Sequence, residues 1–155
     1  MGLISDFLFG RHITIENERI GRLKARVKGD NPSINCTWTS EHQLAGQARP
    51  TVFILEGNNK GPHKEQLDSI YKIIDTLNDI VVQVDKRLKT KSDIKERYRR
   101  DWTKEFYLSA IYAYDPFTKG IEKQFEVNFE PITGEDTDYI TMIWDKGRLT
   151  EIEAK

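Results

Sequence analysis

Cysteine is the scarcest chemically reactive residue in this chain of 155 residues, since Cys36 is the only one. A disulfide within the chain is therefore excluded. A thiolate nucleophile needs a base close to it, and His12, His42 and His63 are scattered along the sequence with none placed beside Cys36. We expect Cys36 to be a small, buried residue rather than a catalytic one.

Long apolar runs are also missing, and no stretch approaches the roughly 20 residues that a membrane-spanning helix needs. In the opening segment MGLISDFLFGRH, the basic Arg11 follows a short apolar stripe, whereas a signal peptide has its basic residues first. A myristoylation signal requires Ser or Thr where this chain has Asp6. We expect residues 3–9 to form a short amphipathic helix that docks on its own domain, with a partner or a membrane surface as alternatives, and the protein to be cytoplasmic.

An excess of one charge is absent as well, because 24 Lys and Arg balance 25 Asp and Glu. The net charge of −1 gives no general attraction to nucleic acid or acidic membranes. Apolar residues make up 37% of the chain and charged residues 32%, and no repeat or linker divides it. These values predict a single domain over residues 1–155, with a small core and a highly charged surface.

Sequence motifs for catalysis are missing too. The segment GNNKGP has three residues between Gly57 and Gly61 and then Pro62, whereas a phosphate-binding Walker loop has four residues followed by Lys and Ser or Thr. The acidic segment GEDTDY lacks the further ligands of a calcium loop. No zinc-protease or serine-hydrolase motif is present. We therefore expect no enzyme activity, no cofactor and no metal. A small-ligand or enzyme role, from a site assembled in space rather than in sequence, is the third alternative.

The first part of the chain has the alternation of β-strands. Leu23, Ala25 and Val27 alternate with basic residues that share a face exposed to water. The segment GDNP is a turn, and the apolar run TVFILEG is typical of a central strand covered on both faces. We expect strands throughout residues 11–57.

Helices are predicted over residues 62–102. Apolar residues at spacings of three and four indicate one long helix over about 62–88, with Pro62 at its first position. Ile94, Tyr98 and Trp102 follow at steps of four, which indicates a shorter helix over about 92–102. The period returns to two over residues 105–153, as in antiparallel strands. The fold class is therefore α+β, a mainly antiparallel sheet with both helices packed on one face.

The charges are unevenly distributed. Residues 85–104 carry nine Lys and Arg against four Asp and Glu, whereas residues 105–155 carry five against eleven. A solvated helix face and a polar sheet edge would explain this pattern, but it also suits docking on a basic protein partner. The docking residues would be the acidic group with two aromatic anchors, namely Glu122, Glu126, Glu130, Glu135, Asp136, Asp138, Tyr112 and Tyr114.

The alternative function is that of a nucleic-acid-binding accessory protein that uses the basic segment 86–104. Tyr98 and Trp102 are interleaved with its basic residues, but the spacing that places Trp102 with Ile94 on the core face leaves no ring free to stack on a base. The basic patch would consist of Lys89, Lys91, Lys95, Arg97, Arg99 and Arg100. Nucleic acid is the less favoured of the two partners.

Four segments resemble a group of small, uncharacterised bacterial α+β domains: MGLISDFLFG, FILEG before a long helix, WTKEFYLSAIYAYD, and the closing hairpin YITMIWDKGRLTEIE. Domains of that kind are similar to immunity proteins of bacterial toxin systems, or to accessory proteins beside them. The resemblance implies a non-enzymatic protein that neutralises a toxin by occluding its active surface. It implies no functional residue, because none of the segments carries a catalytic motif.

Overall fold

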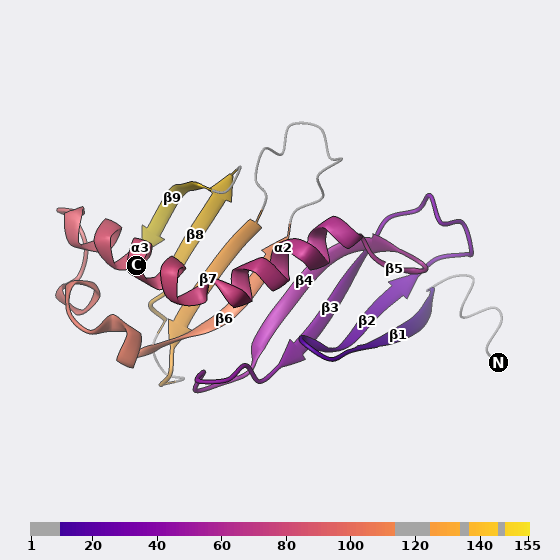
Figure 1. Cartoon of the computed structure of the whole chain (residues 1–155), viewed down its shortest axis with the longest axis horizontal. Helices are drawn as coiled ribbons and strands as arrows, with labels where there is room; N and C mark the ends of the chain where they lie inside the picture. Colours follow the sequence, from indigo (N-terminus) through magenta and orange to yellow (C-terminus); the bar gives the residue numbers. More distant parts are fainter. Residues whose placement is uncertain (1–9, 114–124, 134–136, 146–147) are drawn as a thin grey trace.

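The computed structural model describes residues 10–113, 125–133, 137–145 and 148–155 (Figure 1). The expected docking helix at 3–9 lies outside these residues. The α+β fold is confirmed, with one nine-stranded, mostly antiparallel sheet and two α-helices. The strands are β1 (Arg11–Asn17), β2 (Gly21–Val27), β3 (Cys36–His42), β4 (Thr51–Asn58), β5 (Gly61–Pro62), β6 (Phe106–Ala113), β7 (Phe125–Pro131), β8 (Ile140–Asp145) and β9 (Arg148–Ala154).

The strands lie in the order β1-β2-β3-β4-β6-β7-β8-β9, and the short β5 pairs with β4. Neighbouring strands are antiparallel except β4 and β6, which are parallel. Within the described ranges, all helical residues lie between these two strands in the chain, in α2 (Lys64–Asp75), α3 (Leu77–Thr90) and the 3₁₀ segments η1 (Glu96–Arg99) and η2 (Trp102–Lys104). A long crossover of this kind is what a parallel pair requires.

Both α-helices lie across the same face of the sheet (Figure 1). They bury their apolar stripes there, with Ile70 and Ile73 on α2 and Val84 and Leu88 on α3. The central strands contribute alternate residues to this core, which includes the fully buried Trp38 and Phe53, except at a bulge in β6 where Leu108 and Ser109 are both buried. The predicted packing of helices on one face of a mainly antiparallel sheet is therefore confirmed for α2 and α3.

The single helix predicted over 62–88 is wrong in two respects. It is divided at Thr76, whose φ of −112° and ψ of 17° leave the helical region, and whose hydroxyl donates to the carbonyl oxygen of Lys72. The first helix also begins at Lys64 rather than at Pro62. Pro62 belongs instead to β5, where it pairs with Gly57 in a hairpin.

The shorter helix predicted over 92–102 is also wrong, because only η1 and η2 are helical there. The apolar spacing does describe the packing, since Tyr98 and Trp102 are buried. The backbone carbonyl oxygens of Lys91 and Ser92, however, accept side-chain hydrogen bonds instead of those of a helix. Arg99 donates to the carbonyl oxygens of Lys91 and Ser92 at 2.9 Å each, and the backbone of Lys95 is extended.

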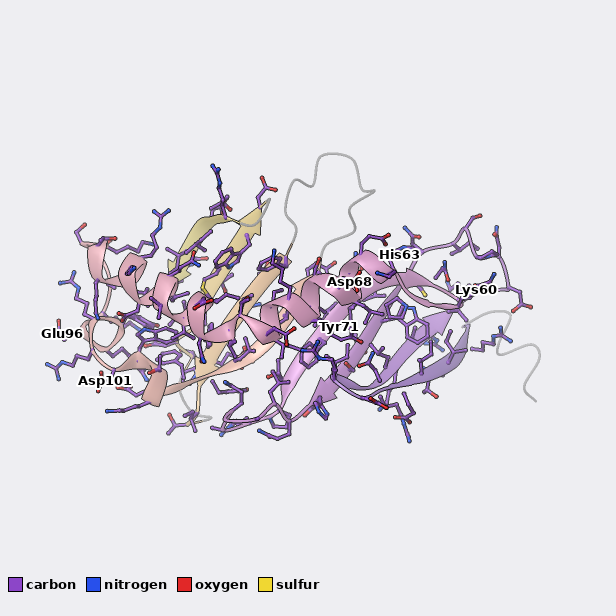
Figure 2. All side chains as sticks on the ribbon, viewed as in Figure 1. Lys60, His63, Asp68, Tyr71, Glu96 and Asp101 are labelled. Carbon is purple, nitrogen blue, oxygen red and sulfur yellow. The ribbon has the colours of Figure 1, made fainter. Side chains whose placement is uncertain are left out.

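The expectation that β4 is covered on both faces is wrong as well. Thr51, Phe53 and Leu55 are buried beneath the helices, whereas the alternate residues Val52 and Ile54 are only half-buried. The helices therefore cover one face of the sheet. Figure 2 shows that the two ends of this layer are far apart, with Lys60 and His63 near β5 and Glu96 and Asp101 beside η1 and η2.

Candidate functional site

The face of the sheet opposite the helices is accessible along the described strands. We call it the open face, and none of the side chains that define it is buried. They are Arg22, Lys24 and Arg26 on β2; Thr37, Thr39 and Glu41 on β3; Val52, Ile54 and Glu56 on β4; Tyr107, Ala110 and Tyr112 on β6; Glu126, Asn128 and Glu130 on β7; Thr141 and Ile143 on β8; and Glu151 and Glu153 on β9.

The strand register places these side chains in rows that cross the sheet. Residues directly opposite one another on paired strands point to the same face. One row, traced through the pairs of neighbouring strands, contains Lys24, Thr39, Ile54, Tyr112, Glu126, Ile143 and Glu151. Along this row the surface changes from basic to apolar and aromatic, and then to acidic.

The centre of the open face is apolar and held by hydrogen bonds. Val52 pairs with Ala110, and Ile54 pairs with Tyr112 across the parallel β4–β6 junction. The Tyr112 hydroxyl donates to Oε1 of Glu56 at 3.4 Å, and the Thr37 hydroxyl donates to the same oxygen at 3.0 Å. The predicted aromatic anchor Tyr112 therefore stands at the middle of this face, with its ring orientation restrained.

The acidic part of the open face includes two of the predicted docking residues, Glu126 and Glu130. Oε1 of Glu126 accepts a hydrogen bond from Asn128 at 3.0 Å, and Asn128 in turn accepts one from Thr141 at 2.6 Å. Glu130 accepts one from the Tyr107 hydroxyl at 3.4 Å. Burial, and then the nearby Glu130 carboxylate, raise the pKa of Tyr107, so its hydroxyl stays protonated and able to donate.

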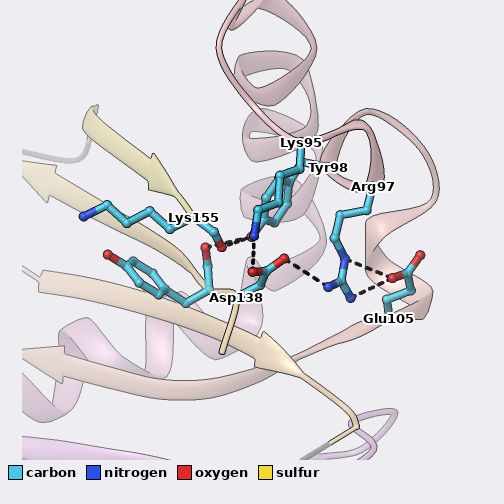
Figure 3. A network of polar contacts seen from close by, with 7 residues as sticks. Lys95, Arg97, Tyr98, Glu105, Asp138 and Lys155 are labelled. Carbon is cyan, nitrogen blue, oxygen red and sulfur yellow. Dashed lines mark hydrogen bonds and ion pairs between the residues drawn. The ribbon is translucent and has the colours of Figure 1, made fainter. Parts of the chain in front are cut away.

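The other predicted acidic residues are not brought to this surface together. Glu122, Glu135, Asp136 and the aromatic Tyr114 lie outside the described residues. Asp138 is buried, with 9% of its surface exposed. Figure 3 shows its carboxylate between Lys95 and Arg97, with which it forms ion pairs.

The contacts of Asp138 connect two surfaces that were predicted as alternatives, the acidic docking residues and the basic patch. Arg97 reaches Oδ2 of Asp138 at 3.0 Å and also pairs with Glu105 at 2.7 Å. Tyr98 beside them donates its hydroxyl to the carbonyl oxygen of Lys155 (Figure 3). This network fastens η1 to the sheet, so Lys95, Arg97 and Asp138 have structural contacts within the domain.

The remaining residues of the predicted basic patch also have partners within the chain. Lys89 pairs with Asp85 at 2.6 Å and Arg100 with Glu96 at 3.4 Å, both as exposed pairs. Nζ of Lys91 donates to the carbonyl oxygen of Ile152 at 2.7 Å, and Arg99 contacts backbone carbonyls as described above. Tyr98 and Trp102 are buried, so neither ring of this segment is available to stack on a base.

Two shallow grooves lie along the open face. One, of about 590 Å³, is lined among others by Arg22, Lys24, Thr39, Glu41 and Val52. The other, of about 510 Å³, is lined among others by Arg49, Asn128, Glu130 and Thr141. The first lies toward the basic strand and the second toward the acidic strands, so both ends of this face have relief that a partner's side chains can fill.

Comparison with known proteins gives no relative from which a function can be transferred. No protein-family model matches this chain. No curated protein and no solved structure matches it either. Its resemblance to immunity-type domains therefore stays a prediction, and the case for a function rests on the open face itself.

Within the described ranges, no three or more His, Cys, Asp and Glu side chains are grouped so that they could hold a metal ion. No helix there has the length and apolar character that crossing a membrane requires.

Several open-face residues were missed as candidates at the sequence level. Val52, Ile54 and Tyr107 carry the centre and the acidic side of the face, yet TVFILEG alone suggests a strand buried on both sides. The informative pattern was the alternation of Lys24 and Arg26 with buried residues, which correctly placed the basic side chains on an exposed face.

Cys36, at the start of β3, provides a reporter of this region. Burial, and then the carboxylate of Glu56, raise the pKa of its thiol, whereas a hydrogen bond involving Trp38 lowers it. A higher pKa leaves less thiolate at any given pH. We expect iodoacetamide to alkylate Cys36 at pH 8 more slowly than it alkylates a free cysteine, and Glu56→Gln to increase that rate.

The control for this experiment is Thr37→Val, which removes a hydrogen bond to Glu56 and keeps its charge. It should leave the rate closer to that of the unchanged protein than Glu56→Gln does. A pH profile equal to that of a free thiol, unaffected by Glu56→Gln, would contradict the effect of burial and charge.

Proposed function

We propose that this protein is a non-enzymatic protein-binding module that docks through its open face onto a protein with a basic surface. The observation that carries the proposal is that, among the described residues, helices cover one face of the sheet only, with apolar and aromatic side chains at the centre of the other face. Accessible surfaces with an apolar centre and a charged rim are typical of protein interfaces.

The charge of the proposed partner follows from β7 and β9. Glu126, Glu130, Glu151 and Glu153 stand on the part of the open face beyond the aromatic centre. Complementary charge speeds encounter and restricts the choice of partner. Tyr112 and Tyr107 are the aromatic anchors of the proposed interface, because tyrosine contributes large contact area with little loss of conformational entropy.

The resemblance to immunity-type domains supports a more specific form of this proposal, in which the partner is a toxin. A broad sheet face suits inhibition by occlusion, since it can cover an active surface without entering it. A nucleic-acid partner for segment 86–104 has less support, because Lys95 and Arg97 pair with Asp138 and the two aromatic rings are buried.

The test is affinity capture from the native cell with the tagged chain, followed by mass spectrometry. The unchanged protein should retain one stoichiometric basic protein, and the double variant Glu126→Lys with Glu130→Lys should bind it at least 100-fold more weakly, on the order of 3 kcal/mol for reversed charges at an interface. The matched control reverses Asp79 and Asp93, which are exposed residues of the helical layer.

Capture counts in favour only if the open-face variant loses the partner and the control retains it. Equal binding by both variants would remove the open face from the interaction. Recovery of nucleic acid that is released by salt, and lost on replacing Arg99 and Arg100 by Gln, would replace the proposal with the basic segment.

A further inference from the structure

On the open face, β4 has three strands on one side and four on the other, and in one row the charges two strands away from it are opposite. β3 and β6 flank β4, and β2 and β7 lie one strand further out on either side. Lys24 stands on β2 and Glu126 on β7, in the same row as Ile54 on β4. Each is therefore roughly 10 Å from Ile54, two strand spacings of about 4.8 Å.

Such a surface matches a second copy of itself in one orientation. Consider a two-fold axis that runs parallel to β4, midway between two sheets whose open faces meet. It places each row of one copy over the same row of the other copy. It also places the β2 side of one copy over the β7 side of the other. Lys24 of one copy then faces Glu126 of the other, twice by symmetry. Thr39 faces Tyr112. The open-face residues of β4 itself, Val52, Ile54 and Glu56, each meet their own counterparts, so one contact between the two Glu56 carboxylates stands against two Lys24–Glu126 pairs.

The charges favour this arrangement over the other simple one. A two-fold axis in the plane of the sheet but perpendicular to the strands would place β2 against β2 and β7 against β7. Lys24 would then face its own counterpart, as would Glu126, and like charges across an interface are strongly unfavourable. Arg22 is less informative, because it already forms an exposed ion pair with Glu16 of β1.

The size of the face is adequate for a stable pair. From β1 to β8 there are six strand spacings, and strands of about seven residues give a footprint of roughly 29 by 23 Å, close to the 800 Å² or so per partner of a standard interface. Two sheets whose strands stay nearly aligned pack face to face at about 10 Å, which suits this axis.

The geometry points to a second copy of this chain as the occupant of the open face: the protein forms a two-fold dimer, sheet against sheet, with its axis along β4. The inference rests on the proposed use of this face for protein binding, and adds that a second copy and the basic partner compete for it. Dimerisation covers the apolar centre whenever the partner is absent.

The test uses the purified full chain without any partner, in sedimentation velocity at micromolar concentration. The unchanged protein should be a dimer that weakens as salt is added. Lys24→Glu and Glu126→Lys, each alone, should weaken the dimer at least tenfold, because each creates two like-charge contacts. Mixing the two variants should restore a heterodimer, since each acidic position then faces a basic one.

The exposed helical variant Asp79→Lys should remain a dimer, and circular dichroism should show that all variants are folded. A monomeric unchanged protein, or a mixture that stays monomeric, would overturn the inference. These results are separate from affinity capture: a monomer that still binds a basic protein through Glu126 sinks the dimer alone, and a dimer that captures nothing sinks the proposed function alone.

Discussion

Replacing Trp102 by alanine is expected to lower the free energy of unfolding by about 3 to 5 kcal/mol, the range found for large aromatic truncations in a core. Trp102 is 1% exposed and packs edge-on against Phe129, with 5.2 Å between ring centroids, and against Phe106 at 6.5 Å. The change leaves a cavity where η2 meets β6 and β7. Urea unfolding followed by circular dichroism measures the loss.

Two further variants, one conservative and one on the surface, provide comparisons for the loss of stability in Trp102→Ala. Trp102→Phe should cost less than the alanine variant, because no hydrogen bond of the Trp102 indole is found among the described residues and most of the apolar area is kept. Val82→Ala, at a side chain that is 52% exposed, should change stability by no more than about 0.5 kcal/mol. If Trp102→Ala cost as little as Val82→Ala, the packing of η2 on the sheet would be wrong.

The second large effect is expected at Gly57, where Gly57→Ala should cost about 3 kcal/mol as an overpacked backbone contact. A Cβ at this position would overlap the carbonyl oxygen of Gly61 and lie 2.5 Å from Cα of Pro62. The three nearest atoms are all backbone atoms of β5, so no flexible side chain can move away. The β4–β5 hairpin would have to open, which also disturbs the bond from the His63 amide to the Glu56 carbonyl oxygen at 3.0 Å.

Gly29→Ala is the control that distinguishes the steric clash at Gly57 from the backbone strain of a residue with positive φ. Gly29 has a φ of +76°, but a Cβ there would meet no atom within 4 Å. Its replacement should cost about 1 kcal/mol, the strain of a left-handed residue with a side chain. Thermal unfolding of both variants decides the matter, and equal losses would show that β5 does not approach Gly57 closely.

The local elements of this fold were predictable where a regular period coincides with burial on one side. The alternation of Phe125, Val127 and Phe129 predicted β7 and its core face correctly. The division of the long helix at Thr76 was not predictable, because the apolar stripe continues through it. The helix expected at 92–102 failed because the guanidinium of Arg99 takes up two carbonyl oxygens, and apolar spacing carries no information on that competition.

The candidate site was harder to predict because it depends on contacts between distant parts of the chain. Asp138 and Lys95 were placed on opposite candidate surfaces, yet they are partners across 43 residues. The open face required the strand order as well, since Lys24 and Glu126 share a row only through the parallel pairing of β4 with β6. Charge counts along the sequence identified the acidic region, but not the surface that joins it to the basic strand.

The parallel junction between β4 and β6 also has a consequence for how the chain folds. On either side of it, antiparallel strands follow one another directly in sequence, from β1 to β4 and from β6 to β9. The junction alone joins these two meanders within the sheet, and it brings Val52 beside Ala110. Closing a loop of that length costs more entropy than forming a hairpin, so we expect the two meanders to assemble first and the junction to set the folding rate.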